Sequence, residues 1–251
     1  MEIITSKTNK YVKLCHSLCD KKYRKESGLC LLEGKKIITE AIKCNKKVDF
    51  IFTTINNYEV AVKEFEKINI FVADKSIIEY MSSTLTPQDY VGVCHVDTDR
   101  YFLPDSNYLL LDSLQDPSNL GMIIRTAVAT GFTNIYLLNC VDEYSTKVVR
   151  SSMGNLFRCK FVHITYNEIK DFKDTLYICD MCGENIFTIH TFDKIVGLCI
   201  GNEGHGISSI VKEIITKKIS LPMKNDVESL NAGVSASVIM YHISINQKEI
   251  S

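Results

Sequence analysis

The segment DPSNLGMIIRTAVATGF at 116–132 is mostly apolar after Asn119, and Arg125 is its one charged residue there. Asn119 and Arg125 lie near the start of what should be a helix, and a helix that is apolar on nearly every face is normally buried. Arginine keeps its charge, so burying its guanidinium without a partner is costly. We therefore expect Arg125 either to pair with a group from elsewhere in the chain, for example Glu203, or to face a site.

A second stretch, GLCIGNEGHGIS at 197–208, ends an apolar strand in a glycine-rich turn. Glycines such as Gly201 permit positive φ and a close approach of the backbone to a ligand, and the turn holds one acid, Glu203. The spacing is not the G-x-G-x-x-G of a dinucleotide site, and it lies late in the chain. The alternative interpretation is a tight turn that binds nothing.

A third stretch, ISLPMKNDVESLNAGVSAS at 219–237, combines a strand end with hydrogen-bonding side chains. Pro222 stops the strand, and Ser229 and Asn231 lead into a helix rich in Ala, Ser and Gly. Small residues on such a helix suit close packing against a neighbour.

The elements that must position these turns follow from the hydrophobic pattern. Apolar strands alternate with helices along both halves of the chain, which predicts an α/β protein with mostly parallel sheets covered on both faces. A polar stretch at 97–107 interrupts the alternation and is the expected linker, so we expect a first domain at 1–97 and a second at 107–251. All three turns then follow the C-terminal ends of parallel strands, where open α/β sheets collect ligand sites.

Charge is unevenly distributed along the chain. The net charge is −1, but residues 1–47 hold twelve Lys or Arg against five Asp or Glu. Such a segment is a plausible electrostatic footprint for nucleic acid. The alternative is a solvated, lysine-rich helix surface.

The remaining composition favours a cytoplasmic protein. No apolar run is long enough to span a bilayer, and the N-terminal residues lack the apolar core of a signal peptide. The ten cysteines mostly sit in apolar runs and read as buried, reduced thiols. Cys179 and Cys182 form a single C-x-x-C without a second pair at zinc-site spacing, so we expect no metal site.

The three stretches resemble, in order and spacing, the signature motifs of the SpoU/TrmH family of RNA ribose methyltransferases. The resemblance covers roughly residues 107–246, and the basic N-terminal part is similar, more weakly, to the L30e-like substrate-binding domain of that family. It implies a C-terminal SPOUT α/β domain with a trefoil knot, preceded by a smaller L30e-like α/β domain. It also implies a homodimer, an S-adenosylmethionine cofactor and an RNA substrate.

Residue roles are carried over from the motif positions. The resemblance implies that Gly201, Leu221 and Leu230 contact the cofactor, largely through backbone groups. It implies a polar catalytic cluster, whose members are Asn119, Arg125, Glu203, Ser229 and Asn231. The family mechanism makes the motif arginine a base, which is awkward for a group with a pKa above about 12. We instead expect Arg125 to bind a phosphate or the developing alkoxide, with Glu203 orienting it.

Several functions remain open at this point. The first choice is methyl transfer to the ribose 2′-hydroxyl of a guanosine in 23S ribosomal RNA, because an L30e-like extension is typical of ribosomal RNA members. A transfer-RNA position is the alternative. A non-catalytic RNA-binding protein of the same fold, or a nicotinamide-dependent oxidoreductase, would be distinguished by which cofactor binds.

Overall fold

The computed structural model describes residues 2–84, 86–97, 100–225 and 227–247. The chain divides into two compact units, which are treated separately below. The first comprises Met1–Asp97 together with Asp142–Phe157, and the second comprises Thr98–Val141 with Arg158–Ser251. Two residues of the expected linker, 98 and 99, lie outside the described residues, as do the last four residues of the expected second domain.

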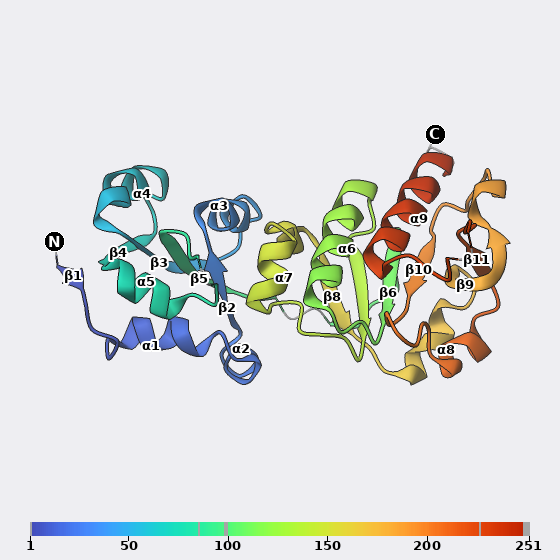
Figure 1. Cartoon of the computed structure of the whole chain (residues 1–251), viewed down its shortest axis with the longest axis horizontal. Coiled ribbons are helices and arrows are strands. Elements are labelled where there is room, and N and C mark those ends of the chain that lie inside the picture. The colour runs from blue at the N-terminus through green and yellow to red at the C-terminus, as the bar shows by residue number, and fades with distance from the viewer. Residues whose placement is uncertain (1, 85, 98–99, 226, 248–251) are drawn as a thin grey trace. The chain divides into compact units, whose positions relative to one another are not determined.

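The first unit is built on a five-stranded sheet in the order β1-β4-β3-β5-β2. Its strands are β1 (Ile3–Ile4), β2 (Leu29–Glu33), β3 (Val48–Thr53), β4 (Asn69–Ala73) and β5 (Tyr90–His95). Its α-helices are α1 (Lys10–Ser17), α2 (Lys21–Ser27), α3 (Lys35–Lys43), α4 (Tyr58–Glu64), α5 (Lys75–Met81) and α7 (Thr146–Ser151) (Figure 1). The expected parallel pairing is only partly right, because β5 runs antiparallel to both β2 and β3.

Local capping explains why the first helical segment is broken in two. The side chain of Asn9 accepts a hydrogen bond from the backbone of α1, and Asp20 does the same for α2. Asp20 therefore starts a new helix three residues after α1 ends. Gly28, in the left-handed region at φ 65°, ends α2.

The segment Asp142–Phe157 packs with the first unit although it connects two strands of the second. The guanidinium of Arg24 is buried and donates to Asp142 Oδ2 from Nε at 2.9 Å and from Nη2 at 2.6 Å. Arg150 Nη1 lies 2.8 Å from Oε2 of buried Glu33. These two ion pairs fasten α7 to the elements around β2, and the sequence pattern does not indicate them.

The second unit holds a six-stranded sheet in the order β11-β9-β10-β6-β7-β8, with every pair parallel. The strands are β6 (Tyr108–Asp112), β7 (Asn134–Leu138), β8 (Lys160–His163), β9 (Leu176–Asn185), β10 (Gly197–Ile200) and β11 (Lys218–Ser220). The helices are α6 (Pro117–Thr130), η3 (Tyr166–Phe172), η4 (Ile186–Thr188), α8 (Ser209–Ile214) and α9 (Ala232–Asn246). The expected α/β class with a parallel sheet is confirmed for this unit.

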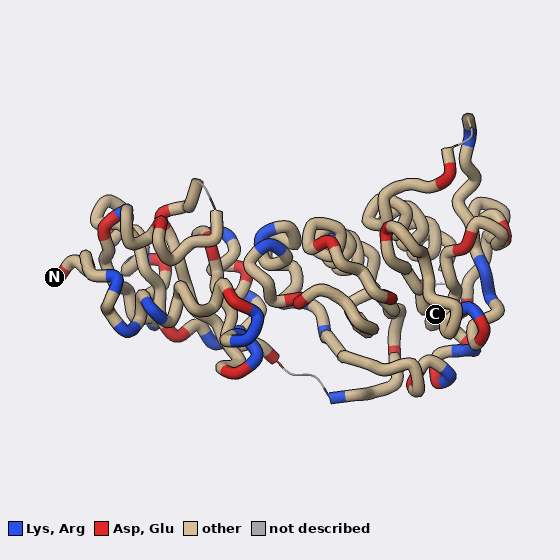
Figure 2. Tube along the Cα trace, turned by 60° about the horizontal axis from the view of Figure 1, so that its bottom comes forward, with Lys and Arg blue, Asp and Glu red and all other residues tan. Residues whose placement is uncertain are grey.

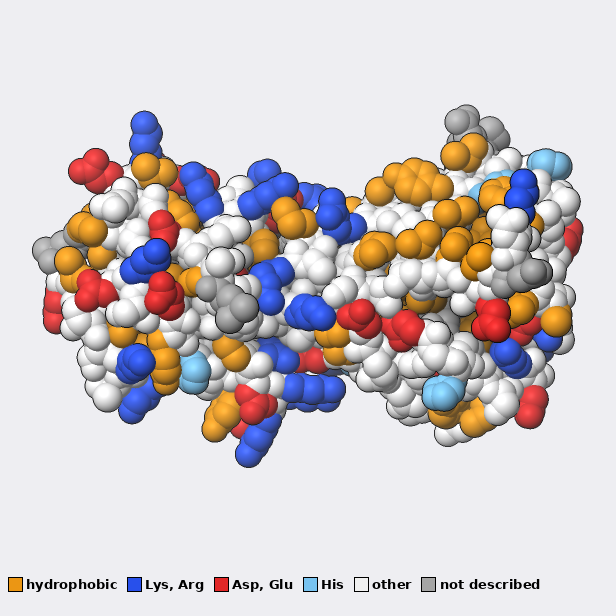
Figure 3. Space-filling model, in the orientation of Figure 1, with side chains coloured by type: hydrophobic (Ala, Val, Ile, Leu, Met, Phe, Trp, Pro, Cys, Tyr) orange, Lys and Arg blue, Asp and Glu red, His pale blue; other side chains and the backbone are white. Residues whose placement is uncertain are grey.

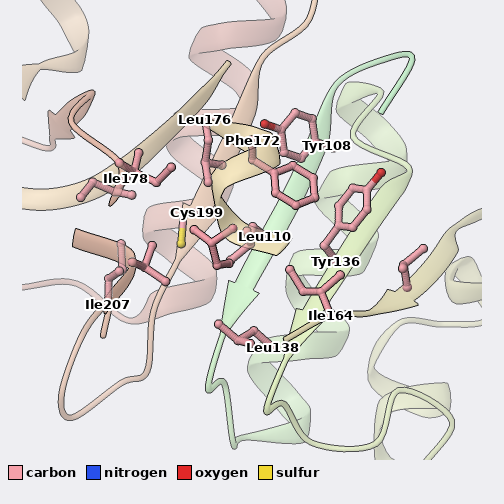
Figure 4. Packing of buried hydrophobic residues seen from close by; sticks show 14 residues of the cluster. Tyr108, Leu110, Tyr136, Leu138, Ile164, Phe172, Leu176, Ile178, Cys199 and Ile207 are labelled. Carbon is pink, nitrogen blue, oxygen red and sulfur yellow. The ribbon is translucent and has the colours of Figure 1, made fainter. Parts of the chain in front are cut away.

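Both faces of the second sheet are buried. On one face, Tyr108, Tyr136 and Phe172 pack with alternate residues of the strands and with η3 and α8 (Figure 4). The intervening strand residues, such as Leu109 and Leu111, are equally buried on the other side. Strands buried on two faces explain the continuous apolar runs in this half of the sequence. No helix among the described residues is long and apolar enough to cross a membrane.

Candidate functional site

Helix α6 begins at Pro117 and does not bury Arg125. Asp116 caps it, accepting from the backbone N–H of Ser118 at 2.8 Å, and Pro117 occupies the first turn. The expectation that this helix is buried on all sides is wrong, because Met122 and Arg125 are both exposed. Within the described part of the chain, Arg125 has no ion-pair or hydrogen-bond partner, and Glu203 pairs elsewhere.

The glycine turn after β10 folds back on itself. Asn202 and Gly206 exchange two backbone hydrogen bonds of 3.0 and 2.9 Å. A Cβ on Gly201 would lie 2.3 Å from the carbonyl carbon of Gly206, so only glycine fits there. Gly201 is thus required by this turn itself. The turn presents Glu203 as an exposed carboxylate.

Two polar residues that sequence reasoning missed hold this turn against the end of β6. Asn202 Nδ2 donates to the carbonyl of Ser113 at 2.9 Å, while its Oδ1 accepts from two N–H groups of the turn. Asp112 is fully buried at the last position of β6, and its Oδ2 accepts from the N–H of Ser208 at 2.8 Å. Asp112 could have been found in the sequence, because it is an acidic residue at the end of an apolar strand.

A directional chain of hydrogen bonds joins the three motifs. Asn119, only 3% exposed, donates from Nδ2 to Glu203 Oε1 at 2.8 Å. Its Oδ1 accepts from Asn231 Nδ2 at 2.9 Å. Asn231 caps α9, accepting from the N–H groups of Gly233 at 2.9 Å and Val234 at 3.3 Å. Because a carboxylate can only accept, each hydrogen bond in the chain is donated in the same direction, from the N-terminal, positive end of α9 towards Glu203.

A cavity of about 340 Å³ lies at the same end of the sheet. Its lining includes three of the expected residues, Leu221, Ser229 and Leu230, as well as Cys179 and Asp180 from β9. Gly201 is not part of the lining, nor are Asn119, Arg125, Glu203 and Asn231. The cavity and the hydrogen-bonded cluster are adjacent in the sequence, because Asn231 directly follows the lining residues 229 and 230.

The cavity combines apolar walls with a few charged groups. Asp180 accepts from Lys212 at 2.9 Å, and this bond, with one from a backbone N–H, holds the pKa of Asp180 below its ordinary value. Burial raises the pKa of Cys179 to about 12, so its thiol stays neutral and does not act as a nucleophile. The described residues contain no group of three or more side chains that could hold a metal ion.

An apolar face runs along α6 and α9 beside the motifs. Its exposed hydrophobic residues are Met122 (39%), Val234 (41%), Val238 (37%), Tyr241 (50%) and Ile245 (75%). Figure 3 shows hydrophobic side chains gathered over these two helices. Arg125 follows Met122 by three positions on α6, so it lies on the same stripe.

Comparison with known proteins gives a consistent result over the whole chain. The sequence profile described as the SpoU rRNA Methylase family matches residues 106–241, and one described as an MRM3-like substrate binding domain matches residues 9–92. A 23S rRNA (guanosine(2553)-2′-O)-methyltransferase, RlmP of Bacillus subtilis, is 27% identical over 97% of this chain and 99% of its own length. An uncharacterised tRNA/rRNA methyltransferase of Synechocystis is 30% identical over 95% of this chain and 92% of its own.

Solved structures share the fold. The AdoMet-bound rRNA methyltransferase from Sinorhizobium meliloti superposes with a TM-score of 0.83 at 24% identity, covering 96% of both chains. The SpoU methyltransferase AviRb from Streptomyces viridochromogenes, also with AdoMet, gives 0.83 at 23% identity, over 94% of this chain and 97% of that one.

Proposed function

This chain belongs to the SpoU rRNA methylase family, and on that premise we propose that it methylates the ribose 2′-hydroxyl of a guanosine in 23S ribosomal RNA. The protein is an RNA methyltransferase, and S-adenosylmethionine is its methyl donor. The observation that carries the proposal is the hydrogen-bond chain from Asn231 through Asn119 to Glu203, which unites all three motifs and begins at the residue that follows the cavity lining. The guanosine and the 23S molecule follow the RlmP relative.

The cavity suits S-adenosylmethionine chemically. Leu221, Leu230 and Ile239 offer apolar walls for an adenine ring, while Asp180 and Glu228 offer carboxylates for a cationic end. The bound cofactor supplies an electrophilic methyl group on a sulfonium centre. We propose that Leu221 and Leu230 hold it largely through backbone groups and that Ser229 positions the sugar beside it. Gly201 supports the cofactor site indirectly, because it allows the turn after β10 to fold back on itself.

Arg125 is proposed to bind the RNA at the reacting sugar. A guanidinium does not give up its proton near neutral pH, so it serves better as a ligand for a phosphate or for the developing alkoxide. Glu203 accepts a hydrogen bond from Asn119, which supports a role for Glu203 other than orienting Arg125. We propose that Asn119 and Asn231 fix the Glu203 carboxylate so that it can accept the proton of the 2′-hydroxyl.

We further propose that two copies of the chain pair through the apolar face of α6 and α9. The exposed residues Val238, Tyr241 and Ile245 are costly to leave in water, and a second copy presenting the same face would cover them. Arg125 lies on that face, so pairing brings it from open solvent to the edge of the partner's site. We also propose that the second unit contains a trefoil knot. A cytoplasmic location is proposed as well, and the ten free thiols support it, because thiols stay reduced in the cytosol.

Methylation mapping in total RNA tests the proposed function. Ribose 2′-O-methylation is compared, nucleotide by nucleotide, in cells with and without the protein. We expect one guanosine of 23S ribosomal RNA to lose its methyl group when the protein is absent. A change confined to transfer RNA would support the alternative substrate, and no change in any RNA would refute methyl transfer as the function.

A further inference from the structure

The outer side of α1, in the first unit, is an exposed basic face. Lys10, Lys13 and His16 follow one another at three-residue spacing, which places them on one side of the helix, and all three are exposed. Lys7 precedes them in the same exposed segment. Residues 3–19 contain no Asp or Glu, so the lysines are the charged side chains of this segment (Figure 2).

His16 is held rigidly on this face. Its ring stacks on Tyr80 of α5, with centroids 4.2 Å apart and planes 11° from parallel. Its Nδ1 lies 2.9 Å from the backbone carbonyl of Tyr80, and because a carbonyl only accepts, Nδ1 carries the proton and donates it. Lys7 Nζ also lies over the Tyr80 ring, 4.7 Å from its centroid.

The outer surface of His16 is left without a ring partner. Among the described residues, Tyr80 is the only aromatic side chain that stacks on it. A flat ring already fixed by a stack and a hydrogen bond loses little freedom when another ring is added. Lys13 lies one helical turn before His16 and Lys10 one turn before that, so both can supply positive charge for phosphate contacts beside the ring. Stacking combined with phosphate contacts is how proteins bind unpaired RNA.

We infer that the α1 face, formed by Lys7, Lys10, Lys13 and His16, binds an unpaired segment of the RNA substrate. One base stacks on the outer surface of His16, and the three lysines contact the phosphates beside it. The segment is unpaired because a base inside a duplex has both faces covered by its neighbours. The inference rests on the proposed RNA methyltransferase function and assigns this face a role in selecting the substrate.

The stacking contact is tested by binding of the full-length protein to two RNA probes. One is a hairpin with an unpaired loop, and the other is a fully paired duplex of the same length; binding is followed by fluorescence anisotropy. His16→Ala should weaken binding of the hairpin by about fivefold to a hundredfold, the range for loss of one stacked base, and leave duplex binding unchanged. His16→Phe, which restores a flat ring, should recover most of the hairpin affinity.

The lysine contacts are tested by the salt dependence of hairpin binding. Lys10→Gln combined with Lys13→Gln should lower the slope of log affinity against log salt by about 1.4, for two phosphates on a single strand. The matched control is Lys63→Gln with Lys67→Gln. These lysines are also exposed in the first unit, but acidic residues are interspersed around them at 59, 64 and 66. The control should leave the slope unchanged.

The outcomes separate this inference from the proposed function. The stacking contact is overturned if His16→Ala binds the hairpin as tightly as the unaltered protein, or if it binds hairpin and duplex equally more weakly. The lysine contacts are overturned if the Lys10 and Lys13 double variant shows an unchanged salt slope. Binding of S-adenosylmethionine and methyl transfer to ribosomal RNA are measured on the same proteins. If the unaltered protein transfers methyl groups while the His16 variants bind normally, only this inference fails. If the unaltered protein binds neither cofactor nor RNA, the proposed function fails with it.

Discussion

Replacing Asn119 by aspartate tests the hydrogen-bond chain that unites the three motifs. Asn119→Asp keeps the shape of the side chain but exchanges the donating amide for a second carboxylate. It removes the 2.8 Å bond to Glu203 and puts two negative groups in contact. A hydrogen bond to a charged acceptor contributes about 1.5–3 kcal/mol. Solvent screens the repulsion because Glu203 is exposed, so we expect a total loss of about 2–3 kcal/mol.

The measurement is urea unfolding of the second unit, with Glu203→Gln as the second arm of a double-mutant cycle. Glu203→Gln supplies an amide that can donate to the new carboxylate, so the double variant should recover about 1 kcal/mol or more. The pH dependence has a definite sign. Facing carboxylates raise each other's pKa in the folded state, so the penalty of Asn119→Asp is greatest above that pKa and fades as pH falls through it.

Two results would refute this argument. One is an Asn119→Asp variant as stable as the unaltered protein at neutral pH. The other is a penalty that Glu203→Gln does not relieve and that does not change with pH. Either would mean that the bond between Asn119 and Glu203 contributes nothing to holding the site.

Substitutions at four further residues test other parts of the structure. Arg125→Ala should abolish methyl transfer and preserve S-adenosylmethionine affinity in calorimetry, while Arg125→Lys should recover little activity if the planar guanidinium is needed. Tyr241→Glu should convert a dimer to a monomer in sedimentation velocity, because it places a charge in the apolar face. Arg24→Met should lower the free energy of unfolding of the first unit by about 3–5 kcal/mol, because it leaves the carboxylate of Asp142, whose side chain is only 10% exposed, without its charged partner. Burial and a carboxylate partner raise the pKa of Tyr101 to about 12, so Tyr101→Phe should remove a phenol that ionises near pH 12 in an ultraviolet titration.

Each of these four has a result that contradicts it. Methyl transfer by Arg125→Ala would remove that residue from the mechanism. A Tyr241→Glu variant with the same sedimentation coefficient as the unaltered protein would place any dimer contact elsewhere. Arg24→Met with unchanged stability would mean that the ion pair with Asp142 contributes little. A phenol lost near pH 10 would contradict the hydrogen bond that the Tyr101 hydroxyl donates to Asp171.

Local sequence features predicted most of the second unit. Its strands are buried on both faces, so each stands out as an apolar run, and every strand pair in its sheet is parallel as expected. The expected α/β architecture and the family resemblance of the motifs are confirmed. The ends of helices are harder to predict, because the hydrophobic pattern fades gradually along the sequence. The actual start is set by a capping side chain such as Asp116 or Asp20.

The sequence by itself determined which residues could do chemistry and that they follow strand ends. Only the tertiary structure decided which of them meet: Asn119 contacts Glu203, 84 residues away, while Arg125 stays in solvent. It also decided that β5 runs antiparallel and that Asp142–Phe157 joins the first unit. The physical reason is that hydrophobic periodicity and capping report burial and local hydrogen bonding. Strand order and ion pairs between distant segments depend on the free energy of the whole fold.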